Sequence, residues 1–304
     1  MNNSTHDNYG YPEGGKRVSG GQRSVGQPTG GRSSGQRSEG QPRRRRKRKK
    51  SRALYYVILL VLLGILVFSA TKIISYFKQQ ADAADAQKNA QQFITPGTSD
   101  NTGDGDSTGT DGDKTTETKQ PETIDVDFDK MIAKYPDVVG YIYAANTNIN
   151  YMIQHGNGND YYLTHDSEGN SNNNGSIFVE QLNSGSFSDG NTIIYGHNMK
   201  TGMMFAALRN YHTDKGYYEA HPYMYIYTPS QDYRLDLYAG FVCDHDDEIY
   251  ATSLTQSQLE AMAAKSDFKS TIGTPTGRTV TLSTCSYEYN DARYVVIGSL
   301  VPID

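Results

Sequence analysis

The sequence predicts a mainly β domain with a few helices, placed after one membrane-spanning helix and a disordered tail. The first observation behind this is a series of eight short runs of β-branched and aromatic residues between residues 122 and 304. The second is the uncharged stretch Ala53–Ala70, which directly follows a run of cations. The third is the composition of the first 42 residues, which are mostly Gly, Ser, Gln, Asn and Arg.

The amino-terminal segment is expected to be disordered and basic. Residues 1–42 hold almost no aliphatic side chains, so they cannot bury enough surface to offset the entropy lost on ordering. Residues 1–52 contain 14 Lys and Arg against 3 Asp and Glu, whereas the rest of the chain contains 15 against 31. The sequence therefore joins a cationic tail, predicted over residues 1–52, to an acidic remainder.

The span predicted over residues 53–71 is an anchor that crosses the cell membrane once. Its 18-residue uncharged core, Ala53–Ala70, would be about 27 Å long as a helix. The preceding cations, Arg43–Lys50, should stay in the cytoplasm by the positive-inside rule, which places the following domain outside the cell. A cleavable signal peptide fits less well, because Phe68 and Ser69 make a poor cleavage site and the preceding segment is too long. A nucleic-acid or nuclear-targeting role for the cations is disfavoured by their attachment to an apolar span.

Residues 72–121 are predicted to connect the anchor to the folded domain. Residues 71–94 are typical of a helix that continues beyond the membrane. Thr95–Pro121 is acidic and of low complexity, which is typical of a flexible spacer with a reach of roughly 30 Å. The folded domain is then expected to occupy residues 122–304.

The eight predicted strands indicate a β-sandwich or a β-barrel. They are Val138–Tyr143, Ile149–Ile153, Ser176–Glu180, Thr192–Tyr195, Tyr223–Tyr227, Tyr233–Val242, Thr279–Thr284 and Tyr294–Val301. Residues 228–232 (TPSQD) have the composition of a turn that joins two of these strands. The predicted helices are Phe128–Lys134, Met203–Asn210 and Gln256–Lys265. The last of them has a capping box formed by Thr255 and Gln258.

Composition excludes several classes of protein. The chain has only two cysteines, Cys243 and Cys285, which excludes a disulfide-stapled scaffold and a zinc module built on closely spaced thiolates. The acidic bulk argues against nucleic acid as a partner, because phosphate binding needs a basic face. No two histidines are spaced i, i+4 and no H-E-x-x-H motif occurs, so we expect neither a metal nor another cofactor.

Cys285 is the first candidate for chemistry. It ends a predicted core strand and precedes the polar turn Glu288–Asp291, so it should lie where the strand reaches the surface. Arg293 opens the last strand, and a hairpin through that turn would bring its guanidinium beside the thiol, where it favours thiolate and stabilises an oxyanion. The alternatives are a small buried cysteine, a strand-edge arginine on the surface, and a disulfide between Cys243 and Cys285.

His197 is the second candidate. It follows Gly196 at the end of an apolar strand, which leaves the backbone room that a general acid or base requires. The remaining histidines lie in the tail or in Gly-, Asn- and Asp-rich turns, where they are expected to be solvated.

Several motifs in this order resemble the class B members of the sortase family of cell-wall transpeptidases. They are TLSTC at 281–285, RYVVIG from 293, YGHNM at 195–199, NDYYLTHD at 159–166 and GSIF at 175–178. The acidic and basic pair that class B members carry after the last motif reads Glu180 and Leu182 here. The resemblance covers about residues 125–303 and implies an eight-stranded β-barrel with a Cys, His and Arg active site.

The resemblance also assigns roles to individual residues. It implies that Cys285 is the nucleophile, His197 the general acid, and Arg293 the donor to the oxyanion or substrate carbonyl. It implies a substrate groove lined by Asn159, Leu163, Ser283, Ile249 and Tyr250. A turn Asn, a core Leu, a strand Ser and two packed apolar residues are the structural alternatives for these five.

The function implied by the resemblance is that of a membrane-anchored cysteine transpeptidase. Such an enzyme cleaves the C-terminal sorting-signal pentapeptide of a surface protein through a thioester and transfers the acyl group to a peptidoglycan precursor amine, without a cofactor. Three alternatives stay open. One is a pilin-polymerising sortase, another is a hydrolase, and the third is a non-catalytic surface module that binds sorting signals.

Overall fold

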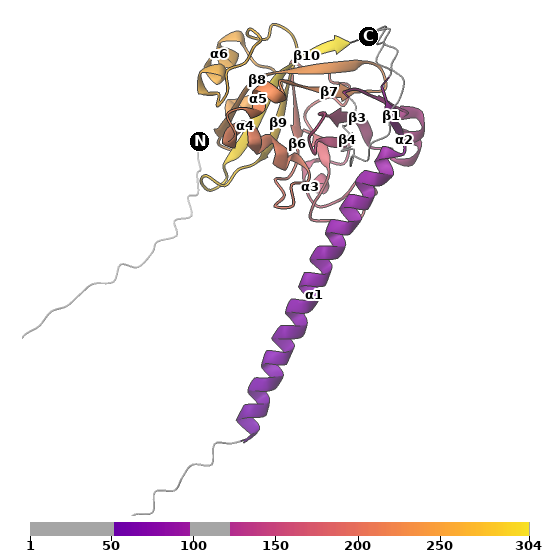
Figure 1. Cartoon of the computed structure of the whole chain (residues 1–304), viewed down its shortest axis with the longest axis vertical. Coiled ribbons are helices and arrows are strands. Elements are labelled where there is room, and N and C mark those ends of the chain that lie inside the picture. The colour runs from indigo at the N-terminus through magenta and orange to yellow at the C-terminus, as the bar shows by residue number, and fades with distance from the viewer. Residues whose placement is uncertain (1–51, 98–121, 304) are drawn as a thin grey trace, which may run out of the picture. The chain divides into compact units, whose positions relative to one another are not determined.

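The computed structural model describes residues 52–97 and 122–303 (Figure 1). The predicted disordered tail up to residue 51, its run of cations and the acidic spacer from residue 98 to residue 121 lie outside the described residues.

Eight strands form a closed barrel in the order β10-β8-β7-β3-β4-β5-β6-β9, which confirms the predicted fold. Their bounds are β3 Val138–Tyr143, β4 Asn150–Gln154, β5 Ile177–Val179, β6 Asn191–Tyr195, β7 Tyr223–Tyr227, β8 Asp232–Cys243, β9 Thr279–Cys285 and β10 Arg293–Ile303. Short strands β1 (Ile94–Pro96) and β2 (Ile124–Val126) pair with each other outside the barrel.

Helices lie at the periphery of this barrel (Figure 1). They are α1 Arg52–Gln91, α2 Phe128–Lys134, α3 Asn159–Tyr162, the 3-10 turn η1 Phe205–Arg209, α4 Asn210–Thr213, α5 Tyr217–Ala220, the 3-10 turn η2 Glu248–Tyr250 and α6 Gln256–Lys265. The predicted capping box of α6 is present, since Thr255 accepts from the Gln258 backbone and Gln258 accepts from the Thr255 backbone. Leu259 and Met262 of this helix pack against the outer faces of β8 and β10.

Two of the barrel pairs are parallel, β4 with β5 and β6 with β9, and the others are antiparallel. In the second parallel pair Tyr195 is opposite Ser283, so both strands end at the same rim of the barrel. Residues at the ends of the two strands therefore emerge side by side. These residues are Gly196 and His197 after β6, and the strand end Cys285 on β9.

Alternation along β9 explains its sequence, TVTLSTC. Val280 and Leu282 belong to the apolar cluster that fills the barrel. Thr279 and Thr281 point to the other face, where both hydroxyls donate to the Asn191 side chain. Because successive side chains alternate, Ser283 and Cys285 continue this polar row toward the rim.

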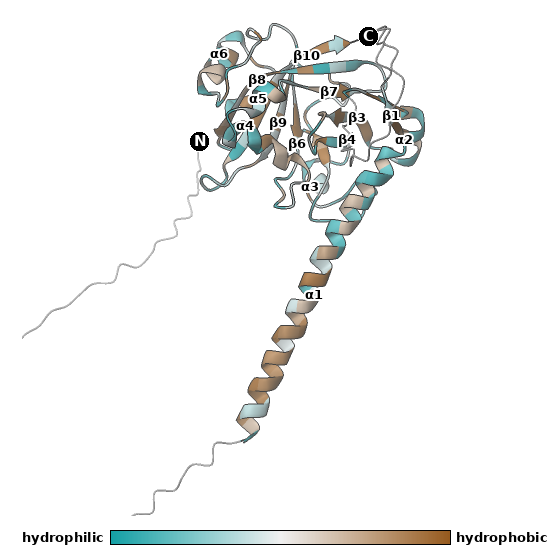
Figure 2. Ribbon diagram, viewed as in Figure 1, coloured by the Kyte–Doolittle hydropathy of each residue, from teal (hydrophilic) through white to brown (hydrophobic). Residues whose placement is uncertain are grey.

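The first part of α1 is apolar and exposed. Large side chains from Leu54 to Phe77 are at least 47% exposed, and the brown colour in Figure 2 follows this part of the helix. Among the described residues, α1 is the one helix long and apolar enough to cross a membrane. The predicted anchor at residues 53–71 lies inside it.

The last part of α1 belongs to the folded domain. Ala83, Ala86 and Ala90 are buried at 4%, 8% and 2% exposure, and Ala90 packs in one apolar cluster with Ile124 and Met131. Residues that follow the helix pair with β2 as strand β1. Residues from about Gln79 to Pro96 thus also pack with the barrel, ahead of residue 122, where the sequence analysis places the start of the folded domain.

Candidate active site

A pocket of about 440 Å³ opens at the rim where β6 and β9 end, a volume in the range of ligand sites. It is lined by Asn159, Asp160, Leu163, Phe178, Tyr195, Gly196, His197, His245, Tyr250, Ser283, Thr284, Cys285 and Arg293. The three residues predicted to carry the chemistry, His197, Cys285 and Arg293, thus line one pocket although they come from separate parts of the sequence.

Cys285 is a free, partly exposed thiol at the end of β9. It is directly opposite Arg293 in the antiparallel β9–β10 pair, which puts the two Cβ atoms about 5 Å apart. Cys243 of β8 is opposite the same arginine from the other side. Strand β10 therefore separates the two cysteines by about 10 Å, too far for the disulfide that the sequence left open.

His197 is placed by the close packing of Gly196. A Cβ at position 196 would lie 2.4 Å from Ile177 and 2.7 Å from Phe205, so a larger residue would push this turn away. The Gly196 amide donates to the Ser283 carbonyl, and the Thr284 hydroxyl donates to the Gly196 carbonyl. These bonds join the turn before the imidazole to the strand that carries the thiol.

One backbone carbonyl fixes the tautomer of His197. Nε2 lies 2.8 Å from the carbonyl oxygen of Leu163, and because a carbonyl oxygen can only accept, Nε2 carries a proton. The other ring nitrogen, Nδ1, is then the one left to interact with the Cys285 thiol, which raises the pKa of this imidazole.

The pair shifts both pKa values toward the charged forms. The hydrogen bond from His197 lowers the pKa of Cys285 below 9.0, against the opposing effect of burial, and the positive charge of Arg293 lowers it further. The same hydrogen bond raises the pKa of His197 above 6.5, with a further contribution from the Leu163 carbonyl. Cys243 behaves oppositely, since burial raises its pKa to about 12. Of the two cysteines, Cys285 alone has the thiolate character that a nucleophile needs.

Arg293 is held by its own backbone neighbours. Its Nη1 donates to the carbonyls of Asp291 and Ala292, at 3.0 and 3.1 Å. Only one guanidinium nitrogen is used in these bonds, so the other N–H groups remain available in the pocket that Arg293 lines. A fork of N–H donors at this place can hold an oxyanion that forms next to the sulfur.

Four of the five predicted groove residues line the pocket. Asn159 is fixed at both ends of its amide, which donates to Glu180 and accepts from the Gln181 backbone. Leu163 is 38% exposed and reaches the opening. Ser283 is buried and shares a hydrogen bond of 2.8 Å with the Tyr250 hydroxyl.

The fifth predicted groove residue, Ile249, does not line the pocket, so this prediction was wrong. Its side chain is fully buried, at 0% exposure, in the apolar cluster between the barrel and α6. Residues 248–250 form a single 3-10 turn, and its tight winding sends Tyr250 into the pocket and Ile249 into the core. The sequence alone does not tell which of two neighbouring apolar residues faces outward on such a short turn.

The structure adds residues that the sequence did not single out for the site. Phe178 and Tyr195 are two of them, and with the predicted Tyr250 they form an aromatic wall, with ring centroids 5.4 and 6.0 Å apart. Asn198 follows the histidine and donates to the carbonyl of Cys285 at 2.8 Å. Only the place of Asn198 next to His197 in the sequence could have pointed to it.

Within residues 52–97 and 122–303, no group of three or more His, Cys, Asp or Glu side chains is placed to hold a metal ion. The chemistry available in the pocket is that of a thiol, an imidazole and a guanidinium. These three groups suit attack on a carbonyl carbon followed by transfer of the acyl group.

Comparison with known proteins agrees with this geometry. The Sortase domain family model matches residues 143–301. Sortase B of Listeria monocytogenes is 36% identical over 173 residues, which cover 54% of this chain and 70% of that protein. Sortase B of Staphylococcus aureus is 28% identical over 193 residues, which cover 61% of this chain and 79% of that protein.

Solved structures show the same fold. A substrate complex of Staphylococcus aureus sortase B aligns with a TM-score of 0.54 and 27% identity, covering 58% of this chain and 85% of that one. A Bacillus anthracis protein described as similar to sortase B aligns with a TM-score of 0.56 and 26% identity, covering 75% of this chain and 98% of that one.

The chain belongs to the sortase family, which makes it a cysteine transpeptidase of the kind that anchors surface proteins to the cell wall. Within that family its relatives and structural neighbours are sortases B, so it is a class B sortase.

Proposed function

We propose that this enzyme cleaves the C-terminal sorting signal of surface proteins through a thioester on Cys285 and transfers the acyl group to a peptidoglycan amine. The observation that carries the proposal is the convergence of Cys285, His197 and Arg293 on one pocket, where the imidazole and the guanidinium lower the pKa of the thiol and the thiol raises the pKa of the imidazole. A structural cysteine gains nothing from such an arrangement.

In the first half of the reaction, the Cys285 thiolate attacks the carbonyl carbon of the scissile amide. The negative charge that develops on the oxygen is held by the Arg293 guanidinium. The C–N bond then breaks, and His197 gives its Nδ1 proton to the leaving amine. The products of this half are an acyl thioester on the enzyme and the free C-terminal peptide.

In the second half, an amine of the cell-wall precursor attacks the thioester carbonyl. His197, now neutral, accepts the proton that this amine loses. The C–S bond breaks and the thiolate returns, paired again with imidazolium. The surface protein is left joined to peptidoglycan through a new amide, with no net oxidation and no need for a cofactor.

The groove supports a peptide substrate in an extended form. Leu163 and the aromatic wall of Phe178, Tyr195 and Tyr250 offer apolar surface on the approach to Cys285. A pentapeptide of the Asn-Pro-x-Thr or Pro-x-Thr-Gly type is the substrate class that the family implies. Staphylococcus aureus sortase B has been solved in a complex with a substrate, and a sortase B has been solved in a complex with triglycine.

The anchor fits this role. Residues 53–71 would cross the cell membrane once, with the amino terminus in the cytoplasm and the catalytic domain outside. Precursor proteins leave the membrane and lipid-linked wall units lie at its outer leaflet, so a tethered domain on that side meets both substrates. The basic residues 1–52 would remain on the inner face.

The test uses the full chain in detergent micelles, incubated with sorting-signal peptides of both types, with and without triglycine. We expect an amide between peptide and triglycine, and only slow hydrolysis in its absence. Hydrolysis at the same rate with and without the amine would identify a peptidase and overturn the proposal. Preference for a lysine side chain of a pilin peptide would identify the polymerising alternative, and binding without any product would identify a non-catalytic module.

A further inference from the structure

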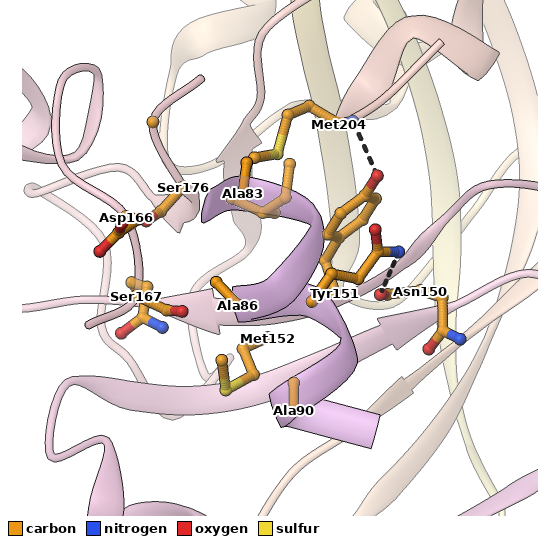
Figure 3. A pocket seen from close by; sticks show the side chains of 14 residues that line it. Ala83, Ala86, Ala90, Asn150, Tyr151, Met152, Asp166, Ser167, Ser176 and Met204 are labelled. Carbon is orange, nitrogen blue, oxygen red and sulfur yellow. Dashed lines mark hydrogen bonds between the residues drawn. The ribbon is translucent and has the colours of Figure 1, made fainter. Parts of the chain in front are cut away.

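The polar end of α1 lies against the barrel beside the catalytic histidine. Ala83, Ala86 and Ala90 are spaced three and four residues apart, so they share one face of the helix, and this face is buried. Figure 3 shows Ala83 next to Met204 and Ser176, and Ala86 and Ala90 over Met152 and Tyr151. We call Gln79–Ala90 the docked segment.

Four hydrogen bonds join the start of the docked segment to the asparagine-rich loop 172–174. The side-chain amides of Asn172 and Asn174 both donate to the Gln79 carbonyl at 3.1 Å, and the Asn173 backbone donates to the Gln79 side chain. Gln80 in turn donates to the Asn174 side chain at 3.0 Å. Asn172 and Asn174 are 2% and 1% exposed, so these bonds satisfy buried amides that would otherwise lack partners.

The residue that follows this loop, Gly175, packs closely against His197 and the carbonyl that orients it. Gly175, which follows the loop, has φ +60°, and a Cβ there would lie 2.9 Å from the Leu163 carbonyl oxygen and 3.1 Å from His197 Cδ2. The Ser176 amide donates to the Tyr162 carbonyl, one residue before Leu163. The position of the loop therefore sets the position of the acceptor for His197 Nε2.

The docked segment also reaches the chain on the other side of His197. Ala83 and Met204 line the same cavity, which Figure 3 shows. Met204 forms an isolated β-bridge with Asn198. Its backbone amide is held in place because it donates to the Tyr151 hydroxyl at 2.8 Å. The next residue, Phe205, donates to the His197 carbonyl at 3.0 Å. The loop 172–174 and the chain around Met204 pack near His197 from two sides, and both contact the docked segment.

We propose that the docked segment of α1 is a positioning element of the catalytic centre, which holds the Leu163 carbonyl in place and so keeps the His197 imidazole in its position beside Cys285. This inference rests on the proposed catalytic roles of His197 and Cys285. Helix α1 takes part in none of the strand pairs that close the barrel, so displacing the docked segment breaks no barrel strand pair.

The test compares Ala83→Arg with Ala84→Arg in the full chain in detergent micelles. Ala83 is buried against the barrel and Ala84 is exposed on the same helix turn, so only the first substitution forces the docked segment away. The measurement is the rate of alkylation of Cys285 by iodoacetamide between pH 5 and pH 10, with mass spectrometry to separate Cys285 from Cys243. The thiolate is the reacting form, so this rate follows the pKa of Cys285.

We expect Ala83→Arg to slow alkylation at pH 7 about tenfold and to move the midpoint of the profile up toward that of an ordinary thiol, near pH 8.5. Ala84→Arg should keep the wild-type profile. The other titratable groups that line the pocket are unchanged in both variants, so they cannot account for a difference. These groups are Asp160, Tyr195, His245, Tyr250 and Arg293.

Two milder variants guard against unfolding. Asn174→Ala removes two of the bonds to the docked segment, and Gln80→Ala removes one from the helix surface. Both should shift the profile in the same direction by a smaller amount, about two- to threefold in rate at pH 7. If all three variants lower the melting temperature but keep the wild-type profile, the docked segment only stabilises the fold and the inference is overturned.

His197→Ala separates this inference from the proposed function. If wild-type Cys285 reacts no faster than Cys243, or if His197→Ala leaves the profile unchanged, the proposed catalytic pair itself is wrong. If the pair passes this test and Ala83→Arg has no effect, only the role of α1 is wrong.

Discussion

At the scale of single residues, Arg293 stands out because its position follows from strand register. It is opposite Cys285 in the β9–β10 pair and its Nη1 is tied to two backbone carbonyls. The guanidinium is therefore fixed relative to the sulfur before a substrate arrives. Fixed donors stabilise a developing charge without the cost of rearranging, which is the main source of oxyanion stabilisation in enzymes.

Replacing Arg293 by Lys should lower kcat/KM for transpeptidation by about 10²- to 10³-fold, because an ammonium keeps the charge and loses the planar fork. The rate of product formation with a sorting-signal peptide and triglycine measures this. Arg278→Lys is the matched control, since Arg278 donates to the Phe187 carbonyl away from the pocket. Equal activity of the wild type and Arg293→Lys would show that charge alone is sufficient.

The pH dependence of transpeptidation should be bell-shaped. Because the pKa of Cys285 is lowered from 9.0, thiolate forms at a lower pH than in an ordinary thiol, and activity is lost as the pH falls and this thiolate is protonated. Because the pKa of His197 is raised from 6.5, the imidazolium that protonates the leaving amine persists to higher pH and is lost as the pH rises further. The two apparent values belong to the coupled pair. A flat profile of kcat/KM from pH 5 to pH 10 contradicts this prediction.

Residue type and strand position made His197, Cys285 and Arg293 candidates, and the resemblance to the sortase family assigned their roles and the groove residues. The rest depended on side-chain direction. The motifs around His197, Cys285 and Arg293 each place a reactive group at the end of a strand, and strand ends can be read from a sequence. The burial of Ile249 could not, because a single 3-10 turn has no periodicity to show which side chain faces the core. Contacts with the docked segment were equally hidden, since they join residues more than 90 positions apart.

At the scale of elements, the parallel pairing of β6 and β9 brings the histidine and the cysteine together. The strands run in the same direction, so both of their carboxyl ends reach one rim, where Tyr195 is opposite Ser283. The chain must then turn sharply after β6 in a space closed by Ile177 and Phe205. Only glycine fits there without moving the packed side chains.

Gly196→Ala should destabilise the domain by about 1–3 kcal/mol, because the added methyl group overpacks this turn. For a domain of this size the melting temperature should fall by roughly 2–4 °C per kcal/mol. The rate of transpeptidation should also fall, even at temperatures where the variant is fully folded, because the same methyl group displaces His197. Gly277→Ala is the control, because a Cβ at Gly277 meets nothing within 4 Å. Equal melting temperatures for the two variants would contradict the packing argument.

The elements themselves were largely predictable. All eight barrel strands were expected within one or two residues of their bounds, and α2 and α6 match their predicted ranges. The short elements α3, α5 and η2 were not expected, since four residues or fewer leave no periodic pattern. Strand β1 falls at the start of the segment expected to be flexible, where pairing with β2 outweighs a polar local composition.

At the scale of the whole molecule, one helix carries both the apolar stretch and the docked segment. The apolar side chains of its first part are exposed in the structure, as expected for a surface that meets lipid. The run of cations at residues 43–50 precedes this stretch in the sequence, and the acidic catalytic domain follows it. Charge asymmetry of this kind favours an amino terminus in the cytoplasm and a domain outside the cell.

This orientation predicts that a membrane-impermeant maleimide reaches Cys285 in intact cells that express the full chain. Labelling should occur at neutral pH, because the lowered pKa of Cys285 provides thiolate there. Cys285→Ala should abolish the label, since the pKa of Cys243 is raised to about 12 by burial. Labelling that appears only after the membrane is permeabilised would place the domain on the cytoplasmic side.

The most direct measurement is the intact mass of the full chain after it is mixed with a sorting-signal peptide in the absence of an amine. An acyl thioester should accumulate on Cys285, disappear on addition of hydroxylamine or triglycine, and be absent from Cys285→Ala. A wild-type protein that turns over the peptide without any adduct at Cys285, or a Cys285→Ala variant that still transfers it, would contradict covalent catalysis at this residue.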